Sequence, residues 1–422
     1  CLAYVVGRGA LDAEELRSSL AEYLPPDWLP LGFTELDGLP LDDAGRVRRG
    51  ELGETARGRR IDHFVAPRTA TELALVRIFE ELFGFGPIGV HQGFFELGGH
   101  SLLALSLLAR VRSVLAVDLP LSSLLGASSV EALAQRVDRA RGAGEALSGD
   151  EAWDPLAAIS PAGSRRPVFC VHPGGGNVLC YVDLAYRLGE EQPLYGLEAR
   201  GREAGETPLE SVAEMAEAYL SSIRRVQPHG PYRLAGWSFG GLVAFEMARR
   251  LEAAGESAEW VALFDTALRE GEFIVDDQAL LRDYLGEELP IPQAELEARG
   301  GIDEQLAYAV ERAQEAGLLP RGTSPERLRR LFEVRKANLR AGAAWQPGQQ
   351  PGQLAGQLAG TVVLFRAADR PEEGLGVDYG WGRWAARVEV VEVPGDHATM
   401  LRSPHVETLA LRLANWLVEE ER

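Results

Sequence analysis

The chain has 422 residues, 46% of them hydrophobic, which is enough apolar sequence for two or three domains with at least one large core. Its formal net charge of −20 argues against a nucleic-acid binder, because phosphate contacts need clustered lysine and arginine. Three cysteines without metal-ligand spacing are too few for a disulfide framework, and no apolar run is long enough to cross a membrane, so we expect a cytoplasmic protein.

The first 50 residues hold too little apolar sequence for an independent core. Residues 2–6 fit a strand, residues 12–24 fit a helix, and prolines interrupt the segments that follow. Residues 51–68 carry glycine, arginine and proline without apolar periodicity, as linkers do. We interpret residues 1–50 as the tail of a larger domain, in a fragment that begins at Cys1 within a strand-like run.

Residues 69–141 show an all-helical pattern. Apolar residues recur at helical spacing in three stretches, which are Leu73, Val76, Ile78, Phe79 and Leu82, then Leu102, Leu105, Leu108 and Val111, then Val130, Leu133 and Val137. This spacing predicts a small helical bundle. Residues 142–154, rich in glycine, alanine and acidic residues, predict a flexible tether to the next domain.

After residue 154, short apolar runs alternate with helical patterns. Strands are predicted at 167–171, 194–197, 232–237, 260–264, 361–365 and 388–393, and helices at 212–226 and 242–254. The alternation is typical of an α/β fold with a mostly parallel sheet and helices on both faces. A long helical and polar stretch interrupts it, so we expect an inserted lid at about 268–345. The PGQ and LAGQ repeats in 346–360 predict a surface loop.

The most specific motif is Gly-Trp-Ser-Phe-Gly at 236–240, which follows a predicted strand and opens a predicted helix. A nucleophile elbow needs this pattern, because small residues beside the serine permit the sharp turn that lifts its hydroxyl above the sheet edge. The plain alternative is a serine that only caps the helix. The strand–turn–helix context favours Ser238 as the nucleophile of an α/β-hydrolase fold.

A serine nucleophile needs a base, and in this fold the order along the chain is serine, acid, histidine. His397 follows a predicted strand in Pro-Gly-Asp-His, and His405 is the one competitor after the nucleophile; the alternative for His397 is a solvated loop histidine. Asp265 and Asp369 each follow a predicted strand and could orient the base. We favour Asp265, which directly follows the strand after the nucleophile's strand, although it could also cap the first lid helix.

An oxyanion hole needs two backbone N–H groups. One belongs to the residue after the nucleophile, here Phe239, and the other to a loop after an early strand. Residues 172–176, His-Pro-Gly-Gly-Gly, form such a loop, and their glycines let the backbone approach a ligand closely. We choose Gly174 as the second donor and interpret His172 as structural. The run lacks the GK[ST] ending of a phosphate-binding loop.

A second constellation is Phe-Phe-Glu-Leu-Gly-Gly-His-Ser-Leu-Leu-Ala at 94–104. Here a Gly-Gly turn precedes Ser101 at the start of an apolar helix, whose dipole tolerates a bulky anionic substituent on the hydroxyl. From this chemistry alone, a plain N-cap is the preferred interpretation of Ser101.

Taken with these residues, the chain resembles the C-terminal part of a nonribosomal peptide synthetase. Residues 94–103 are similar to the carrier-domain signature whose serine bears a covalent 4′-phosphopantetheine arm, which implies that cofactor on Ser101. The elbow at 237–241 and the spacing to Asp265 resemble type I thioesterases, in which the acid follows the strand after the nucleophile.

Residues 1–50 resemble the small C-terminal subdomain of an adenylation domain, with one departure. The usual Asn-Gly-Lys is Ala-Gly-Arg at 44–46, so Arg46 stands where the family has a lysine that contacts the substrate. The nucleotide-binding core is absent from the sequence, so the chain by itself is not expected to activate amino acids.

The resemblance implies a multidomain chain. Its parts would be an α+β fragment of an adenylation domain at 1–55, a linker at 56–68, an all-α four-helix peptidyl carrier domain at 69–141, a linker at 142–154, and a thioesterase domain with the α/β-hydrolase fold at 155–422.

The implied function is carriage and release of a peptidyl or acyl chain. The thioester would pass from the arm to Ser238, with His397 as base and then acid, and leave by hydrolysis or macrocyclisation. Implied partners are a phosphopantetheinyl transferase and upstream synthetase domains, without nucleic acid or membrane. Two alternatives are a docking and carrier module whose hydrolase-like domain is inactive, and a type II editing thioesterase, against which the fusion to a carrier weighs.

Overall fold

The computed structural model describes residues 65–94, 97, 99, 101–117, 119, 121–125, 129–142, 153–189, 191–268, 277–281, 291–315, 324–347, 356–369 and 376–417, with short stretches at 2–6, 16, 19–20, 32–36, 38–40, 47 and 59–60. Contacts divide the chain into two units, residues 1–99 with 127–144 and residues 100–126 with 145–422. Most of the predicted helix 12–24, and Arg46, lie outside the described residues. The domain boundaries given above stay predictions.

Among its described residues, the first unit contains a small sheet together with helices. Strand β1 (Leu2–Val5) pairs in parallel with β2 (Gly32–Glu35), and β3 (Arg59–Arg60) pairs antiparallel with β2. The two-residue strand β3 thus lies inside the segment that the sequence predicts as linker.

Helices α2 (Ala70–Phe83) and α4 (Val130–Gly142) of the same unit pack together through apolar stripes. Thr69 and Glu72 form a capping box at the start of α2, and Gly84 ends it with φ of 72°. Phe79 of α2 and Leu133 of α4 are fully buried, in line with the predicted periodicity.

The second unit includes α3 (Ser101–Leu115), η3 (Leu121–Leu124) and a seven-stranded sheet. The strands are β4 (Leu156–Ser160), β5 (Val168–Val171), β6 (Leu194–Leu197), β7 (Tyr232–Trp237), β8 (Ala258–Phe264), β9 (Leu358–Ala367) and β10 (Ala385–Val393). Their order across the sheet is β10-β9-β8-β7-β5-β6-β4, and all neighbours are parallel except β4 and β6. The six predicted strands are present, and the parallel sheet confirms the predicted fold class.

The edge strand β4 was not predicted. It is a short Leu-Ala-Ala-Ile-Ser run in which only Ala157 and Ile159 are buried, so its composition carries a weak strand signal. The predicted surface loop at 346–360 is wrong at its end, because residues 358–360 already belong to β9 and Leu358 is buried.

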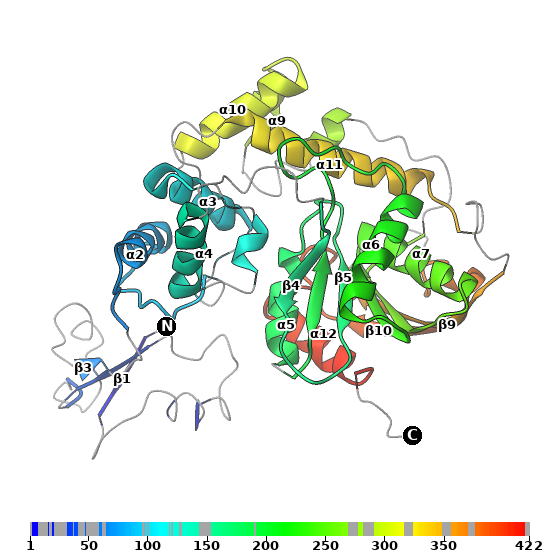
Figure 1. The fold of residues 1–422 in the computed structure, drawn as a ribbon, viewed down its shortest axis with the longest axis horizontal. Coiled ribbons are helices and arrows are strands. Elements are labelled where there is room, and N and C mark those ends of the chain that lie inside the picture. Colours follow the sequence, from blue (N-terminus) through cyan, green and yellow to red (C-terminus); the bar gives the residue numbers. More distant parts are fainter. Residues whose placement is uncertain are drawn as a thin grey trace. The chain divides into compact units, whose positions relative to one another are not determined.

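Helices cover both faces of the sheet (Figure 1). On one face α6 (Val212–Val226) and α7 (Phe239–Ala253) pack against the central strands, and on the other lie α5 (Val182–Leu188) and α12 (His405–Ala414). Strand β5 is buried along its whole length, as expected of a parallel strand covered on both sides. Two 3-10 turns lie in the connections between these elements. The turn η4 (Leu179–Tyr181) precedes α5, and η5 (Trp381–Arg383) precedes β10.

Between β8 and β9 every described element is helical, which confirms the predicted insertion. It contains α9 (Gln293–Glu297), α10 (Ile302–Glu315) and α11 (Pro325–Ala344), which lie beyond one end of the sheet (Figure 1). These helices share an apolar cluster of their own, made of Leu280, Leu281, Leu296, Leu306, Ala309, Ala313 and Phe332. No helix within the described ranges is long and apolar enough to cross a membrane.

Candidate active site

Ser238 stands at the turn between β7 and α7 with φ of 56° and ψ of −123°. A non-glycine residue in this region is strained, and such strain is the mark of a nucleophile elbow. The flanking glycines are required by space: a Cβ at Gly236 would overlap the backbone of Gly240, and a Cβ at Gly240 would lie 2.6 Å from the carbonyl oxygen of His172.

Buried and partly buried hydrogen bonds hold the elbow in place. The backbone N–H of Trp237 donates to the Tyr181 hydroxyl over 2.8 Å, and that hydroxyl donates to the Val171 carbonyl over 2.6 Å. Burial raises the pKa of Tyr181, so the phenol stays protonated and can donate. On the other side, the Thr266 hydroxyl donates to the Ser238 carbonyl over 2.9 Å.

His397 lies in the loop after β10 and bridges the other two predicted residues. Its Nε2 is 3.0 Å from Ser238 Oγ, and its Nδ1 is 2.7 Å from Asp265 Oδ2. The indole Nε1–H of Trp237 donates to the His397 carbonyl over 3.0 Å and anchors the loop to the elbow. A ring placed between a hydroxyl and a carboxylate in this way can take a proton from the serine.

Asp265 is buried, with 1% of its surface exposed, at the end of β8. Its Oδ1 accepts the backbone N–H of Ala367 over 3.1 Å and the Tyr379 hydroxyl over 3.2 Å, which leaves Oδ2 for His397. Its competitor Asp369 is exposed just beyond the end of β9. The structure therefore pairs His397 with Asp265, the residue that we favoured from the sequence.

The two predicted oxyanion donors follow neighbouring strands in register. Val171 of β5 pairs with Gly236 of β7, and Gly174 and Phe239 each stand three residues further along. Phe239 is the first residue of α7, where helix N–H groups have no intrahelical acceptor. Both positions suit an N–H donor near Ser238, and their roles stay predictions.

His172 is fully buried and forms two hydrogen bonds. Its Nδ1 donates to the Pro173 carbonyl over 2.8 Å, and its Nε2 accepts from the Tyr219 hydroxyl over 2.7 Å. Burial lowers the pKa of His172 to about 4, so the ring is neutral. With both nitrogens engaged away from Ser238, the ring shapes the 172–176 loop and is not placed to act as the base.

Sequence reasoning missed the residues that support the site from a distance. Tyr379 reaches Asp265 across 114 positions, and Tyr181 reaches Trp237 across 56. Neither tyrosine lies in a motif, and the only signal is that buried polar groups such as Asp265 need partners.

Ser101, the residue predicted to carry the phosphopantetheine arm, is the first residue of α3. Just before it, Gly99 donates its N–H to the Phe94 carbonyl over 2.9 Å, and a Cβ on Gly99 would overlap the buried Phe94 ring. A tight glycine turn followed by the N-terminus of a 15-residue helix fits a phosphodiester on the serine, because helix N–H groups favour phosphate.

Both candidate sites lie in segments of the chain that match known protein families. The thioesterase domain family matches residues 166–417, and the phosphopantetheine attachment site family matches residues 74–137. Malpinin synthetase of Mortierella alpina is 43% identical over 255 residues, which are 60% of this chain and 3% of that protein. A dimodular nonribosomal peptide synthase of Bacillus subtilis is 37% identical over 271 residues, 62% of this chain and 11% of that protein.

Two matches extend over nearly the whole chain. Chondramide synthase of Chondromyces crocatus is 30% identical over 423 aligned residues, covering 95% of this chain and 10% of that protein. The crystal structure of a holo four-domain nonribosomal peptide synthetase bound to AMP and glycine is 26% identical, with a TM-score of 0.59, and covers 99% of this chain and 31% of that one. The chain spans only a small part of these curated relatives. It belongs to the thioesterase domain family and is a carrier and thioesterase portion of a nonribosomal peptide synthetase.

Proposed function

We propose that Ser238, His397 and Asp265 are the catalytic triad with which this thioesterase releases a peptidyl or acyl chain from its own carrier. The observation that supports it most is the continuous path from Ser238 Oγ through the His397 ring to the buried Asp265 carboxylate, with contacts of 3.0 and 2.7 Å. Chain release by hydrolysis or macrocyclisation is the chemistry that such a triad performs on a thioester.

In the first half of the reaction, His397 Nε2 takes the proton of Ser238 Oγ, and the oxygen attacks the thioester carbonyl. The N–H groups of Phe239 and Gly174 hold the negative oxygen of the tetrahedral intermediate. The C–S bond then breaks, His397 gives its proton to the departing thiolate sulfur, which leaves as a thiol, and an ester remains on Ser238.

In the second half, His397 deprotonates water or a nucleophile of the chain itself, which attacks the ester. The proton returns to Ser238 Oγ as the acid or the macrocycle leaves. Asp265 holds the Nδ1–H tautomer of His397 throughout and stabilises the imidazolium that forms in each half.

Ser101 is the proposed attachment point for the 4′-phosphopantetheine group, which supplies the thiol that carries the chain as a thioester. A phosphopantetheinyl transferase would load it, and upstream synthetase domains would deliver the chain. With Cys170 and Cys180 both free thiols and buried or partly buried, we propose that the protein works in the reducing cytoplasm.

Intact-protein mass spectrometry tests the whole route. The full chain is incubated with a phosphopantetheinyl transferase and hexanoyl-coenzyme A, and wild type is compared with Ser101→Ala and Ser238→Ala. We expect an arm mass in wild type and in Ser238→Ala but not in Ser101→Ala. The acyl mass should persist in Ser238→Ala and disappear from wild type.

The outcomes separate the two sites. No mass gain in wild type would remove the carrier role of Ser101. Equal acyl lifetimes in wild type and Ser238→Ala would remove the catalytic role of Ser238 and favour a docking module with an inactive hydrolase-like domain.

A further inference from the structure

The helix α11 of the insertion rests directly on both segments that are predicted to form the oxyanion hole. Asn338 donates its side-chain Nδ2–H to the Gly174 carbonyl over 3.0 Å. One turn earlier, Val334 packs so close to Gly176 that a Cβ there would lie 2.6 Å from Val334 Cγ1. One turn later, Gly342 packs against Phe239, whose Cδ2 would lie 3.0 Å from a Cβ at Gly342.

These three residues of α11 recur every four positions and therefore share one face of the helix. Val334 is fully buried and Asn338 is 1% exposed, so this face is closed to water at these two positions, while Gly342 is half-buried. Burying a side-chain amide costs free energy unless the amide is hydrogen-bonded. Asn338 forms such a hydrogen bond with the Gly174 carbonyl, in the loop after β5.

Hydrogen bonds fix two successive peptide groups of the 172–176 loop. The Pro173 carbonyl accepts from His172 Nδ1 over 2.8 Å and from the Gly176 N–H over 2.9 Å. The next carbonyl, that of Gly174, accepts from Asn338. In a trans peptide the N–H points opposite to the C=O, so fixing these two carbonyls also sets the directions of the Gly174 and Gly175 N–H groups.

We propose that Asn338 is a positioning residue for the release reaction: it fixes the Gly174–Gly175 peptide group and thereby holds the adjoining Gly174 N–H, the predicted oxyanion donor, next to Ser238. This inference rests on the proposed function. It makes α11 part of the support of the active site, because the insertion and the oxyanion loop share a partly buried hydrogen bond. Loss of that bond leaves the Gly174–Gly175 peptide without this restraint, and glycine has no side chain to limit its rotation.

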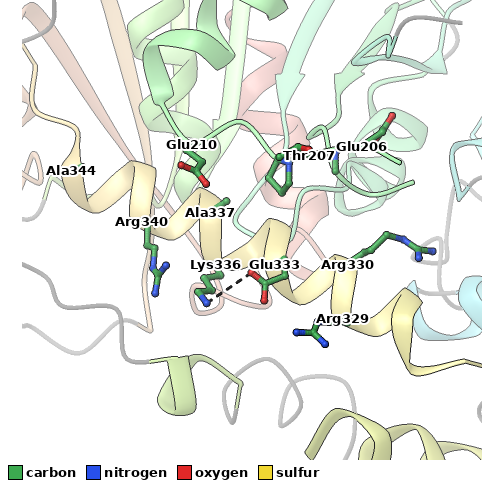
Figure 2. A pocket seen from close by; sticks show the side chains of 12 residues that line it. Glu206, Thr207, Glu210, Arg329, Arg330, Glu333, Lys336, Ala337, Arg340 and Ala344 are labelled. Atoms are coloured by element: carbon green, nitrogen blue, oxygen red, sulfur yellow. Dashed lines mark hydrogen bonds and ion pairs between the residues drawn. The ribbon is translucent and has the colours of Figure 1, made fainter. Parts of the chain in front are cut away.

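The opposite side of α11 provides the control. Figure 2 shows Glu333, Lys336 and Arg340 pointing away from the strands. They belong to the lining of a pocket to which Glu206, Thr207, Pro208 and Glu210 also contribute. Arg340 is exposed and pairs with Asp277 over 2.8 Å. Ser238 is not among the residues that line this pocket, so Arg340→Ala alters α11 only two positions from Asn338 without touching the oxyanion loop.

The test compares wild type, Asn338→Leu, Asn338→Asp and Arg340→Ala as full chains. One assay is steady-state hydrolysis of hexanoyl-N-acetylcysteamine, and the other is the rate at which a fluorophosphonate labels Ser238. We expect Asn338→Leu to lower kcat and the labelling rate by about 10- to 100-fold with KM within about threefold, because misplaced donors weaken the transition state more than substrate binding. Arg340→Ala should stay within about twofold of wild type.

The pH dependence of kcat in Asn338→Asp distinguishes a hydrogen-bonding role of Asn338 from a role in packing alone. Its carboxylate repels the Gly174 carbonyl, whereas the protonated acid donates to it, and burial raises the pKa of such an acid. The ratio of its kcat to that of wild type should rise as the pH falls from 8 to 6, while the ratio for Asn338→Leu stays flat.

A folded Asn338→Leu with wild-type kcat and labelling rate, or with a loss confined to KM, would overturn the inference. If Asn338→Leu does not fold, the ratio of the Asn338→Asp kcat to the wild-type kcat decides instead. A ratio that does not change between pH 8 and pH 6 would contradict the inference. A wild type that does not hydrolyse the thioester would contradict the proposed function instead, and the labelling rates would still decide the role of Asn338.

Discussion

Replacement of Asp265 by asparagine should invert the hydrogen bonding of His397. The Oδ1 position of Asp265 faces the Ala367 N–H, which can only donate, so the asparagine oxygen must occupy that position. The asparagine NH2 then points at His397 Nδ1 and forces the ring into the Nε2–H tautomer. That tautomer cannot accept the proton of Ser238, although the shape of the site is unchanged.

We expect kcat for hexanoyl-N-acetylcysteamine to fall by about 10³- to 10⁴-fold, the size of loss associated with a triad base held in its wrong tautomer. This corresponds to about 4–5.5 kcal/mol of transition-state stabilisation. KM should change little, because no substrate contact is lost. Tyr379→Phe, which removes one donor to Oδ1 but leaves the Ala367 N–H, should cost less than about tenfold.

The matched control is Asp369→Asn at the exposed end of β9, which should leave kcat within about twofold of wild type. An Asp265→Asn protein that keeps kcat within tenfold would refute the reasoning. So would a large loss in Asp369→Asn, which would make that residue the partner of His397 in solution.

Two further predictions concern stability. Because the pKa of His172 is about 4 in the fold and about 6.5 in an unfolded chain, the unfolded state binds more protons between these values, and stability falls as the pH drops through that window by about 3 kcal/mol in all. In His172→Gln the free energy of urea unfolding should decline correspondingly less from pH 7 to pH 4.5; an unchanged slope would contradict the assignment. Gly240→Ala places a Cβ 2.6 Å from the His172 carbonyl oxygen and should lower the urea unfolding free energy by about 3 kcal/mol, whereas Gly301→Ala, with nothing within 4 Å, should change it by less than about 0.5 kcal/mol. Equal stability of the two glycine variants would refute the steric argument.

The features that were predicted from the sequence are local ones. The elbow around Ser238 can be predicted from five consecutive residues, because a strand, a sharp turn and a helix each have sequence preferences that span only a few positions. The strand–helix alternation and the helical insertion follow from periodicities of two and about 3.6 residues in the same way. The carrier signature around Ser101 is equally compact and rests on resemblance rather than on chemistry alone.

The features that only the structure decided join residues far apart in the chain. The choice between Asp265 and Asp369 depends on which carboxylate meets His397, a contact across 132 positions. The antiparallel strand β4 is defined by its partner β6 rather than by its own alanine-rich residues. In the sequence, Asn338 is an ordinary polar residue of a predicted lid helix. Its hydrogen bond to the Gly174 carbonyl, 164 positions away, is visible only in the structure. The sequence by itself indicated most of the strands and helices and the candidate nucleophile, because those features are set by neighbours along the chain. Packing between distant elements decided the hydrogen-bond partners of the candidate catalytic groups, because a hydrogen bond depends on distance in space, which no local pattern records.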